Sequence, residues 1–368
     1  MKIAFIGNSS LTMHNFRINL LKDMIKTGHK VIVIAPKDSD TTAFKSQKIR
    51  FIPIEVDCKG MNPFHDIKLI FQLRKIYLHE KFDFIFHYTI KPVIYGSIAA
   101  SLVNIPHISV ITGLGYTFLN EGFINKLTVK LYRFSQIKTK ELWFLNNDDR
   151  NLFVDKNIIK IEKSKVINGE GVNLKIFHPQ HKSHLKFSFL FIGRVLWDKG
   201  IGEYVAAAKI LRNKYPDVEF QILGALGAAN PAAISPECMD DWEDEGIITY
   251  LGETSKVVPY ILNASCIILP SYREGISRVL LEAAAMEKPI VTTNVTGCRD
   301  IVKHNYSGYL CESKDVNSLA HYMEKMMLLS DDERLEMGRN GRKIVNEKFD
   351  EKIIIKEYHD KLFEIFKK

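Results

Sequence analysis

Short apolar runs alternate with longer segments of helical periodicity along most of the chain, and this alternation limits the possible folds more than any other feature. Turn-forming residues flank the apolar runs, which is typical of strands buried on both faces of a parallel sheet. In the first half we predict strands at residues 2–7, 30–35, 51–56, 84–88, 107–112 and 141–145, and helices at 16–27, 66–79 and 124–137. Strands and helices in alternation predict a doubly wound α/β domain.

The alternation starts again after Pro179, with strands predicted at residues 187–192, 219–223, 248–251, 266–269 and 290–293. A chain of 368 residues is too long for one ordinary core and has room for two. We therefore predict two Rossmann-like domains, at residues 1–179 and 183–348, followed by a last amphipathic helix within 351–368. Two such domains on a short linker are expected to face a central cleft with the carboxyl ends of their strands, where open α/β sheets bind ligands.

The composition is that of a globular protein, with 46% hydrophobic and 26% charged residues. The five cysteines are widely spaced and form no Cys-x-x-Cys pair, which indicates free thiols in a reducing cytoplasm. We predict no export signal, because residues 1–7 lack a basic lead and a small-residue cleavage site. We predict no membrane span, because polar residues and a proline interrupt the most apolar stretch, residues 93–111. Residues 1–179 hold 26 basic and 15 acidic side chains, so we expect this half to contact an anionic surface, either nucleic acid or phospholipid headgroups.

One predicted strand, turn and helix in the second half carries two carboxylates near the amino end of the helix. Glu274 falls in the turn, Gly275 allows a tight bend, and Glu282 lies inside the helix that follows. Helical side chains lean toward the amino end, so Glu282 is directed back toward Glu274 and toward the unpaired N–H groups of the first turn. This arrangement suits a ligand with both hydroxyls and phosphates, such as a sugar nucleotide. The alternative is an ordinary acidic first turn, with Glu282 paired to a basic residue.

A second candidate site is the loop of residues 193–200, between a predicted strand and a predicted helix. Arg194 and Lys199 both lie in this loop, at the carboxyl edge of the second sheet. Two cations in this position are able to neutralise a diphosphate without a metal ion. The alternative is a solvated basic loop capped by Asp198.

The sequence around these residues resembles the family 4 retaining glycosyltransferases, which have the GT-B fold. The resemblance rests on four motifs that occur in the family's order: Asn-Gly-Glu-Gly-Val-Asn-Leu-Lys-Ile-Phe-His-Pro (168–179), Gly-Arg-Val-Leu-Trp-Asp-Lys-Gly (193–200), Arg-Glu-Gly-Ile-Ser-Arg-Val-Leu-Leu-Glu-Ala (273–283) and Lys-Pro-Ile-Val-Thr-Thr-Asn-Val-Thr-Gly-Cys-Arg-Asp (288–300). It implies that the last helix returns to the first domain and that the linkers act as a hinge.

The resemblance also implies roles for individual residues. Arg194 and Lys199 neutralise the diphosphate of a UDP-sugar, Glu282 holds its ribose hydroxyls, and Glu274 holds the donor sugar. Fixed positive charge beside the leaving group is the main requirement of such a transfer, so Arg194, Lys199 and Glu274 are the predicted catalytic residues. A short-lived ion pair on one face of the sugar is favoured over covalent attack by Glu274. The other predicted donor-binding residues are Gly7, Gly275, Ile276 and Ser277, and neither a metal ion nor a cofactor is expected.

The acceptor site is predicted in the first half, in turns that follow strands. Its candidate residues are Asn8, Ser9, His14, His87, Lys91, Gly113 and Tyr116. Asn8 and Ser9 are equally ordinary helix caps, and a satisfied buried histidine is the alternative for His87. Many relatives have a histidine where Thr112 and Gly113 stand, so the role of that histidine is not transferred to this chain.

These acceptor candidates resemble the subgroup that builds bacterial surface polysaccharides on undecaprenyl diphosphate, which includes N-acetylgalactosaminyltransferases. The resemblance implies a hexosyltransferase that moves a sugar, N-acetylhexosamine above all, from a UDP-sugar to a lipid-linked saccharide in the biosynthesis of O-antigen, capsule or another glycan. The non-enzymatic alternative is a sugar-nucleotide-binding subunit of a polysaccharide assembly complex that has lost transfer activity.

Residues 124–140 have the pattern of a basic amphipathic helix without an acidic residue. Its apolar positions are Ile124, Leu127, Leu131 and Phe134, and its basic positions are Lys126, Lys130 and Arg133. Such a helix is able to lie on anionic lipid, although a plain surface helix has the same pattern. Because a lipid-linked acceptor requires a membrane, we predict a peripheral protein on the inner face of the cytoplasmic membrane.

Other functional classes have less support. An NAD-dependent oxidoreductase is disfavoured because no Gly-x-Gly-x-x-Gly follows the first strand. A metal-dependent GT-A transferase would need Asp38-Ser39-Asp40, which follows Pro36-Lys37 in a polar turn where solvated charge is expected. Nucleic-acid binding is supported by the net charge alone, since no recognisable module is present, and we expect no nucleic-acid partner.

Overall fold

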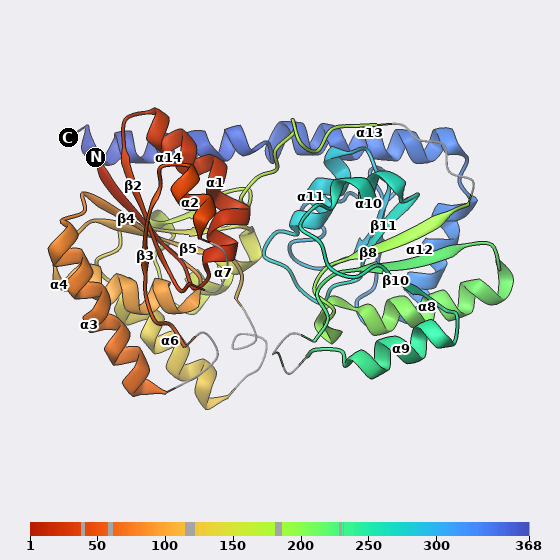
Figure 1. Cartoon of the computed structure of the whole chain (residues 1–368), viewed down its shortest axis with the longest axis horizontal. Helices are drawn as coiled ribbons and strands as arrows, with labels where there is room; N and C mark the ends of the chain where they lie inside the picture. Colours follow the sequence, from red (N-terminus) through yellow and green to blue (C-terminus); the bar gives the residue numbers. More distant parts are fainter. Residues whose placement is uncertain are drawn as a thin grey trace. The chain divides into compact units, whose positions relative to one another are not determined.

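The structure is a computed structural model, and it describes residues 1–37, 41–57, 62–114, 122–180, 186–227, 230 and 232–367. The chain divides into two compact units, each built on its own parallel sheet (Figure 1). Unit 1 comprises Met1–Glu170 and Ile355–Lys368, and unit 2 comprises Gly171–Ile354.

Unit 1 contains a seven-stranded sheet in which all neighbouring strands are parallel, in the order β3-β2-β1-β4-β5-β6-β7. Its strands are β1 (Lys2–Ile6), β2 (Lys30–Ala35), β3 (Arg50–Pro53), β4 (Phe84–Tyr88), β5 (His107–Ile111), β6 (Glu141–Phe144) and β7 (Ser164–Val166). The order reverses between β1 and β4, as expected of a doubly wound sheet.

Helices cover both faces of this sheet. They are α1 (Ser10–Lys26), α2 (Thr42–Ser46), α3 (Pro63–Glu80), α4 (Ser97–Leu102), α6 (Phe123–Ser135), α7 (Asn147–Asp155) and part of α14 (Glu351–Phe366), with the π-turn η1 (Pro92–Gly96) and the 3-10 turn η2 (Ile161–Lys163). On one face, Ile6 and Ile34 pack against Leu73 of α3. On the other face, the rings of Phe86 and Trp143 pack against Tyr358 of α14, with centroids 5.0 and 4.9 Å away.

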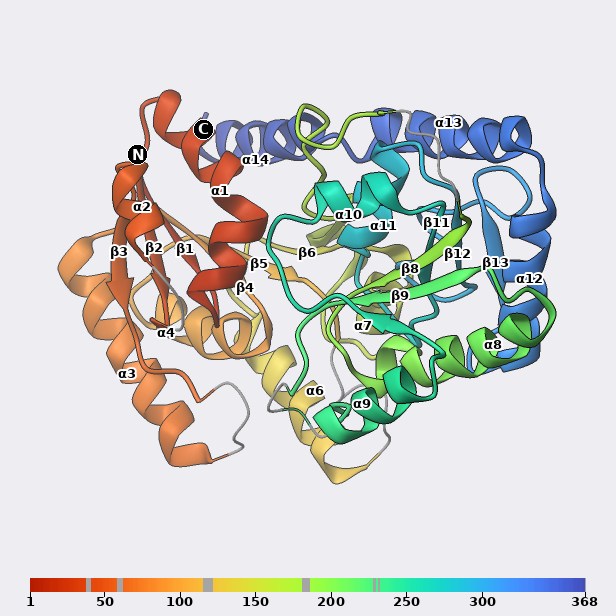
Figure 2. The ribbon, with the colours of Figure 1, turned by 45° about the vertical axis from the view of Figure 1, so that its right-hand side comes forward.

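Unit 2 contains a six-stranded parallel sheet in the order β10-β9-β8-β11-β12-β13. The strands are β8 (Ser188–Ile192), β9 (Glu219–Leu223), β10 (Thr249–Tyr250), β11 (Cys266–Leu269), β12 (Ile290–Thr293) and β13 (Tyr309–Cys311). The helices are η3 (Trp197–Lys199), α8 (Ile201–Lys214), α9 (Pro236–Asp244), α10 (Val258–Asn263), α11 (Arg278–Ala285), α12 (Val316–Leu328) and α13 (Asp331–Lys348). Helix α8 lies beside α12, and α11 lies beside α13 (Figure 2).

The boundary between the units lies at Gly171, earlier than the predicted boundary after Pro179. Val172 explains this difference, because its N–H donates to the Phe349 carbonyl at 2.8 Å and its carbonyl accepts from the Glu351 N–H at 3.1 Å. The stretch after Gly171 is thereby tied to the end of α13. Helix α14 begins in unit 2, and its residues from Ile355 onward belong to unit 1.

Several elements differ from the predictions in extent. Helix α1 begins before the predicted residue 16 because the Ser9 side chain accepts from the Thr12 N–H and caps it. Helix α3 begins before residue 66 because Asn62 caps it and Pro63 occupies its first turn. The short strands β7 and β13 were not predicted, since three residues give too little periodicity. Within the described part of the chain, none of the helices has both the length and the apolar character needed to cross a bilayer.

Candidate active site

The two loops that hold the predicted donor site meet because their strands are neighbours in the unit 2 sheet. β8 and β11 pair in parallel, with Phe191 opposite Ile268, so their carboxyl ends lie at the same edge. The loop after β8 leads through η3 into α8, and the loop after β11 leads into α11. Residues 193–200 and 270–277 are therefore brought side by side at the edge where parallel sheets bind ligands.

Lys199 and Glu274 form an ion pair between these loops. The Lys199 Nζ lies 2.6 Å from Oε1 of Glu274, and the side chains are only 16% and 14% exposed. The Ser271 hydroxyl, which is fully buried, donates to the same carboxylate oxygen at 2.7 Å. A carboxylate that accepts one charge-assisted bond and one hydroxyl bond is held in a fixed orientation.

Backbone contacts lock the same two loops together. The Tyr272 N–H donates to the Asp198 carbonyl at 3.0 Å, and the Tyr272 hydroxyl donates to Glu203 of α8 at 2.7 Å. Gly200 has a φ of +74°, and a Cβ atom there would lie 2.1 Å from the Pro270 carbonyl oxygen. Only glycine fits this position, so the approach of the two loops is encoded directly in the sequence.

Glu282 lies on α11 and is almost completely buried, with 6% of the residue exposed. Its Oε1 accepts from Nε of Arg278 at 2.7 Å, one helical turn earlier. Burial raises the pKa of the Glu282 carboxyl above its usual value, and the charge and hydrogen bond of Arg278 oppose that rise. Arg278 is thus the basic partner that the alternative interpretation of Glu282 predicted. It holds the carboxylate near the amino end of α11.

The remaining donor-binding candidates of unit 2 differ in their exposure and in their hydrogen bonds. Arg194 is exposed and makes no hydrogen bond or ion pair to the described residues, so its guanidinium is available to a ligand. Ser277 is the N-cap of α11, and its N–H donates to the Gly297 carbonyl at 3.1 Å. This N–H of a predicted donor-binding residue is therefore already satisfied by the loop that carries Gly297. Gly275 and Ile276 lie in the same loop and are half-buried.

In unit 1, the predicted residues near the first turn lie where expected at the end of β1. The Gly7 N–H donates to the Ile34 carbonyl at 3.1 Å, and Ser9 is the cap of α1. Asn8 and His14 are half-buried, and the His14 ring lies 3.2 Å from the side-chain oxygen of Asn15. Ser9 therefore has the ordinary capping role that was its alternative.

His87 lies inside the protein. Its ring is fully buried, with Nε2 3.1 Å from the Tyr77 hydroxyl and Nδ1 3.4 Å from the Ser97 hydroxyl. Burial lowers the pKa of His87 well below its usual value, and the neighbouring His107 lowers it further. This agrees with the alternative of a satisfied buried histidine, so we assign His87 no role in binding the acceptor.

Lys91 is engaged as well, because its Nζ lies 2.6 Å from Oδ1 of Asp66, and Tyr95 donates to the other oxygen of that carboxylate at 2.6 Å. Gly113 follows β5 with a φ of +145°, which favours glycine. Tyr116 lies outside the described residues, as does the Asp38-Ser39-Asp40 segment.

Sequence reasoning missed a buried cluster at the end of unit 1. The Arg17 guanidinium forms an ion pair with Glu170 and lies 3.9 Å from the centroid of the Tyr88 ring. The Tyr88 hydroxyl donates to the Tyr358 hydroxyl of α14 at 3.0 Å. The available signal was Glu170 itself, which stands inside the first quoted motif without a role.

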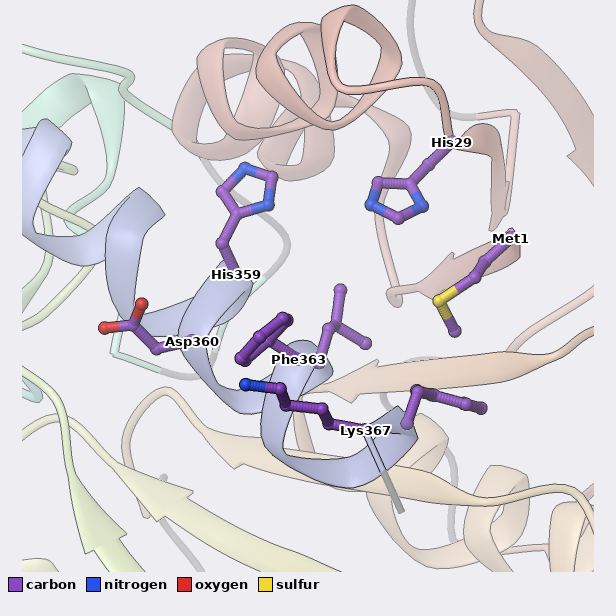
Figure 3. Close-up of a pocket in the computed structure, with 8 residues that line it drawn as sticks. Met1, His29, His359, Asp360, Phe363 and Lys367 are labelled. Carbon is purple, nitrogen blue, oxygen red and sulfur yellow. The ribbon is translucent and has the colours of Figure 1, made fainter.

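A pocket of about 530 Å³ lies elsewhere in unit 1, between the start of β1 and the end of α14 (Figure 3). Met1 precedes β1 and His29 precedes β2, so this pocket is at the amino edge of the sheet. It contains none of the predicted site residues. Parallel sheets bind their ligands at the opposite edge, so we do not assign this pocket to the substrate.

Two family models match this chain. A family model described as Glycosyl transferases group 1 matches residues 174–344, and one described as Glycosyl transferase 4-like matches residues 2–145. The first match contains Lys199, Glu274, Arg278 and Glu282, and the two matches together leave residues 146–173 and 345–368 uncovered.

Two relatives match along most of the chain. The N,N'-diacetylbacillosaminyl-diphospho-undecaprenol alpha-1,3-N-acetylgalactosaminyltransferase of Campylobacter jejuni is 29% identical and covers 97% of each chain. The UDP-Gal:alpha-D-GlcNAc-diphosphoundecaprenol alpha-1,3-galactosyltransferase of Escherichia coli is 28% identical over 85% of this chain and 84% of that protein.

The fold agrees with that of solved structures. The crystal structure of a glycosyltransferase from Rickettsia africae ESF-5 has a TM-score of 0.82 at 19% identity, covering 100% of this chain and 98% of that one. The crystal structure of Anabaena Alr3699/HepE in complex with UDP-glucose has a TM-score of 0.79 at 16% identity, covering 98% of this chain and 99% of that one. This likeness and the two parallel sheets confirm the predicted GT-B fold. The chain thus has a group 1 glycosyltransferase domain at residues 174–344, preceded by a glycosyl transferase 4-like region at residues 2–145.

Proposed function

We propose that the protein is a retaining hexosyltransferase that moves a sugar, N-acetylhexosamine in the first instance, from a UDP-sugar to a lipid-linked saccharide. The observation that carries this proposal is the Lys199–Glu274 ion pair, fixed by Ser271 at the carboxyl edge of the unit 2 sheet. In this pair, a cation and a carboxylate that accepts hydrogen bonds lie side by side, as a substrate with both phosphate and hydroxyl groups requires.

Arg194 and Lys199 neutralise the charge that develops on the departing nucleoside diphosphate. Arg194 is exposed and without a partner among the described residues, and Lys199 has two further N–H bonds to give besides the one to Glu274. Fixed positive charge aimed at the leaving group stabilises the transition state more than the ground state. We therefore propose that the reaction needs neither a metal ion nor a cofactor.

The two carboxylates have separate roles in this proposal. Glu282 is directed toward the amino end of α11 and accepts the ribose hydroxyls, while Glu274 accepts hydroxyls of the donor sugar. Oε1 of Glu274 is already bonded to Lys199 and Ser271, so the carboxylate is better suited to orient the sugar than to attack its anomeric carbon. Transfer on one face of the sugar then retains the configuration of the donor.

The relatives' names support the acceptor and the stereochemistry. One acts on an undecaprenol-diphosphate-linked saccharide, and the other carries both UDP-Gal and an alpha-1,3 linkage in its name. Since the sugar of UDP-Gal is itself α-linked, an α product means retention. We carry both features over to this chain, with the Campylobacter relative favouring N-acetylgalactosamine as the sugar.

A lipid-linked acceptor requires contact with a membrane, and we propose peripheral attachment to the inner face of the cytoplasmic membrane through α6. Ile124, Leu127 and Phe134 of this helix are exposed instead of buried in the core. Lys126 and Lys130 are exposed beside them. An apolar stripe flanked by cations is the pattern of a helix at an anionic interface.

The proposal is tested by incubating the purified protein with UDP-N-acetylgalactosamine and an undecaprenyl-diphosphate-linked saccharide in detergent, and by measuring UDP release and the glycosylated lipid. Turnover that is unaffected by a metal chelator and yields an α linkage is the expected result. A β-linked product would overturn retention. Binding of UDP-sugars without turnover over a panel of acceptors would show that the chain is a binding subunit instead.

A further inference from the structure

Helix α3 has a second apolar surface on the side that faces away from the core. Leu69, Leu73 and Tyr77 are buried against the sheet, as in any helix that covers one face. Four other large apolar side chains of α3 are exposed, by 80%, 50%, 63% and 49%: Phe64, Ile67, Phe71 and Leu78. A surface helix of a globular protein normally carries polar residues at such positions.

The four exposed side chains form one stripe. With 3.6 residues per turn, they fall within about 60° of arc, on the opposite side of the helix from Leu73. Arg74 lies along one margin of the stripe, and Lys68 and Lys75 lie along the other. The pattern is therefore a continuous apolar ridge between two rows of cations.

No acidic residue of α3 is exposed. Asp66 and Glu80 are buried and bonded to basic partners, including Lys91 and Lys2. Arg74 and Lys75 have no ion-pair partner among the described residues, whereas Lys68 is paired with Glu55 at 2.8 Å. The ridge thus has a net positive border, which excludes a basic partner and favours an anionic one.

Helix α6 lies in the same layer as α3. Both helices cover the sheet face that contains Ile6 and Ile111, with η1 and α4 between them (Figures 1 and 2). Of the nineteen exposed large apolar side chains in the described chain, eight lie on α3, α4 or α6: Phe64, Ile67, Phe71, Leu78, Leu102, Ile124, Leu127 and Phe134. A ninth, Ile137, follows α6 directly. The amino ends of α3 and α6 follow β3 and β5, so the layer borders the carboxyl edge of the sheet.

We infer that α3 and α6 together form one docking face for an anionic lipid bilayer, with the α3 ridge as a second anchor independent of α6. Exposed aromatic and aliphatic side chains enter the acyl boundary, and the unpaired cations contact the headgroups. A single amphipathic element gives weak and reversible attachment, whereas two in one layer fix the orientation of unit 1 on the membrane. The inference extends the proposed function, because it brings the acceptor lipid to the edge at which the sheet binds ligands.

Flotation of the full-length protein with vesicles tests the α3 ridge directly. With phosphatidylcholine vesicles that contain phosphatidylglycerol, Phe64→Ser/Phe71→Ser is expected to reduce the partition coefficient at least tenfold. The matched control is Phe363→Ser, which alters a phenylalanine of similar exposure, 61%, on α14. Circular dichroism checks that all variants remain folded, as expected for substitutions at exposed positions.

The charged border is tested separately. Arg74→Gln/Lys75→Gln is expected to lower binding to the anionic vesicles by about fivefold per charge, and binding of the wild type is expected to fall on vesicles of phosphatidylcholine alone. The inference is overturned if both double variants, Phe64→Ser/Phe71→Ser and Arg74→Gln/Lys75→Gln, bind the vesicles as strongly as the wild type does. An equal loss for Phe363→Ser would overturn it as well, and so would a dimer that dissociates in the α3 variants while vesicle binding is unchanged.

This inference and the proposed function are rejected by different experimental results. If the ridge serves only the membrane, Phe64→Ser/Phe71→Ser keeps wild-type turnover on a short-chain, detergent-dispersed acceptor and loses it on acceptor embedded in vesicles. A wild-type protein that floats through Phe64 and Phe71 but transfers no sugar would support the lipid face and reject the transferase. A protein that transfers sugar equally well in both formats, with or without the ridge, would reject the lipid face alone.

Discussion

The two sheets carry polar residues near their carboxyl edges, but the residues are used in opposite ways. In unit 2, Lys199 and Glu274 lie in loops beyond the ends of β8 and β11, where they pair with each other at 2.6 Å. In unit 1, His87 lies within β4 and pairs in register with Ile6 and Ser109. Side chains inside a strand point to the faces of the sheet, so His87 enters the helix layer instead of the edge.

Glu274 and His87 differ in their distance from the end of the strand that carries them. Glu274 stands five residues after Leu269, the last residue of β11, and the intervening turn brings it back over the edge. His87 stands one residue before the end of β4 and is sealed by Tyr77 and Ser97. A polar residue a few positions beyond a strand can therefore reach the edge of the sheet, whereas one inside the strand, such as His87, is buried in the core.

The Lys199–Glu274 pair of unit 2 is tested by removing its cation. We expect Lys199→Ala to lower kcat by about 10²–10³-fold, or about 3–4 kcal/mol, because fixed charge is removed from the leaving group. Lys209→Ala is the matched control, since Lys209 forms a surface ion pair with Glu245 at the same 2.6 Å distance. Equal steady-state kinetics for the two variants would place Lys199 in the scaffold.

Glu282 tests whether the second carboxylate of unit 2 binds nucleotide. Glu282→Ala is expected to raise the Kd for UDP by roughly 10–100-fold, in keeping with about 1.5–3 kcal/mol for hydrogen bonds to a charged group. Isothermal titration calorimetry measures this. Arg278→Met is the control, because it removes the ion pair but keeps the carboxylate. If both variants bind UDP as the wild type does, Glu282 serves only the packing of α11.

The buried histidines of unit 1 predict how stability depends on pH. Burial lowers the pKa of His107 to about 4, and the pKa of His87 is lowered in the same direction. Below pH 6.5 the unfolded chain takes up protons that the folded chain does not, so the free energy of unfolding falls as the pH falls.

Between pH 6.5 and pH 5, His107 alone accounts for a loss of about 2 kcal/mol, at about 1.4 kcal/mol per pH unit. Urea unfolding at pH 7 and pH 5, followed by circular dichroism, measures the loss. His107→Phe removes its share, and a wild-type protein as stable at pH 5 as at pH 7 would contradict the assignment of neutral, buried rings.

The hydroxyl of Tyr77 belongs to the buried surroundings of His87. Tyr77→Phe removes the hydroxyl that bonds His87 and is expected to cost about 1 kcal/mol of stability, with no change in KM for the acceptor. Thermal unfolding and steady-state kinetics report the two quantities independently. An increase in KM without loss of stability would return His87 to the acceptor site.

Much of the fold was predictable from the sequence, for a physical reason. Buried parallel strands must be apolar over several residues, and β1, β4, β5, β8 and β11 are. The two unit 2 loops were also predictable. Only glycine fits at position 200, and Glu274 needs the cation that Lys199 supplies.

The rest could not be read from the sequence, because it depends on contacts far apart along the chain. The partner of Arg17 is Glu170, and that of Tyr88 is Tyr358, with no periodicity linking either pair. The α3 ridge was hidden for another reason. A helix with apolar residues on two sides has a weak amphipathic pattern, and the buried side alone was enough to predict it.

The two oxygens of the Glu274 carboxylate are bonded differently. Lys199 and Ser271 both donate to Oε1, and Oε2 has no hydrogen-bond partner among the described residues. In the role that we propose for Glu274, an arriving sugar meets a carboxylate whose rotamer is already fixed by folding and which still offers lone pairs on Oε2. The entropic cost of immobilising the Glu274 side chain is met during folding, so this cost does not reduce the affinity for a sugar bound there.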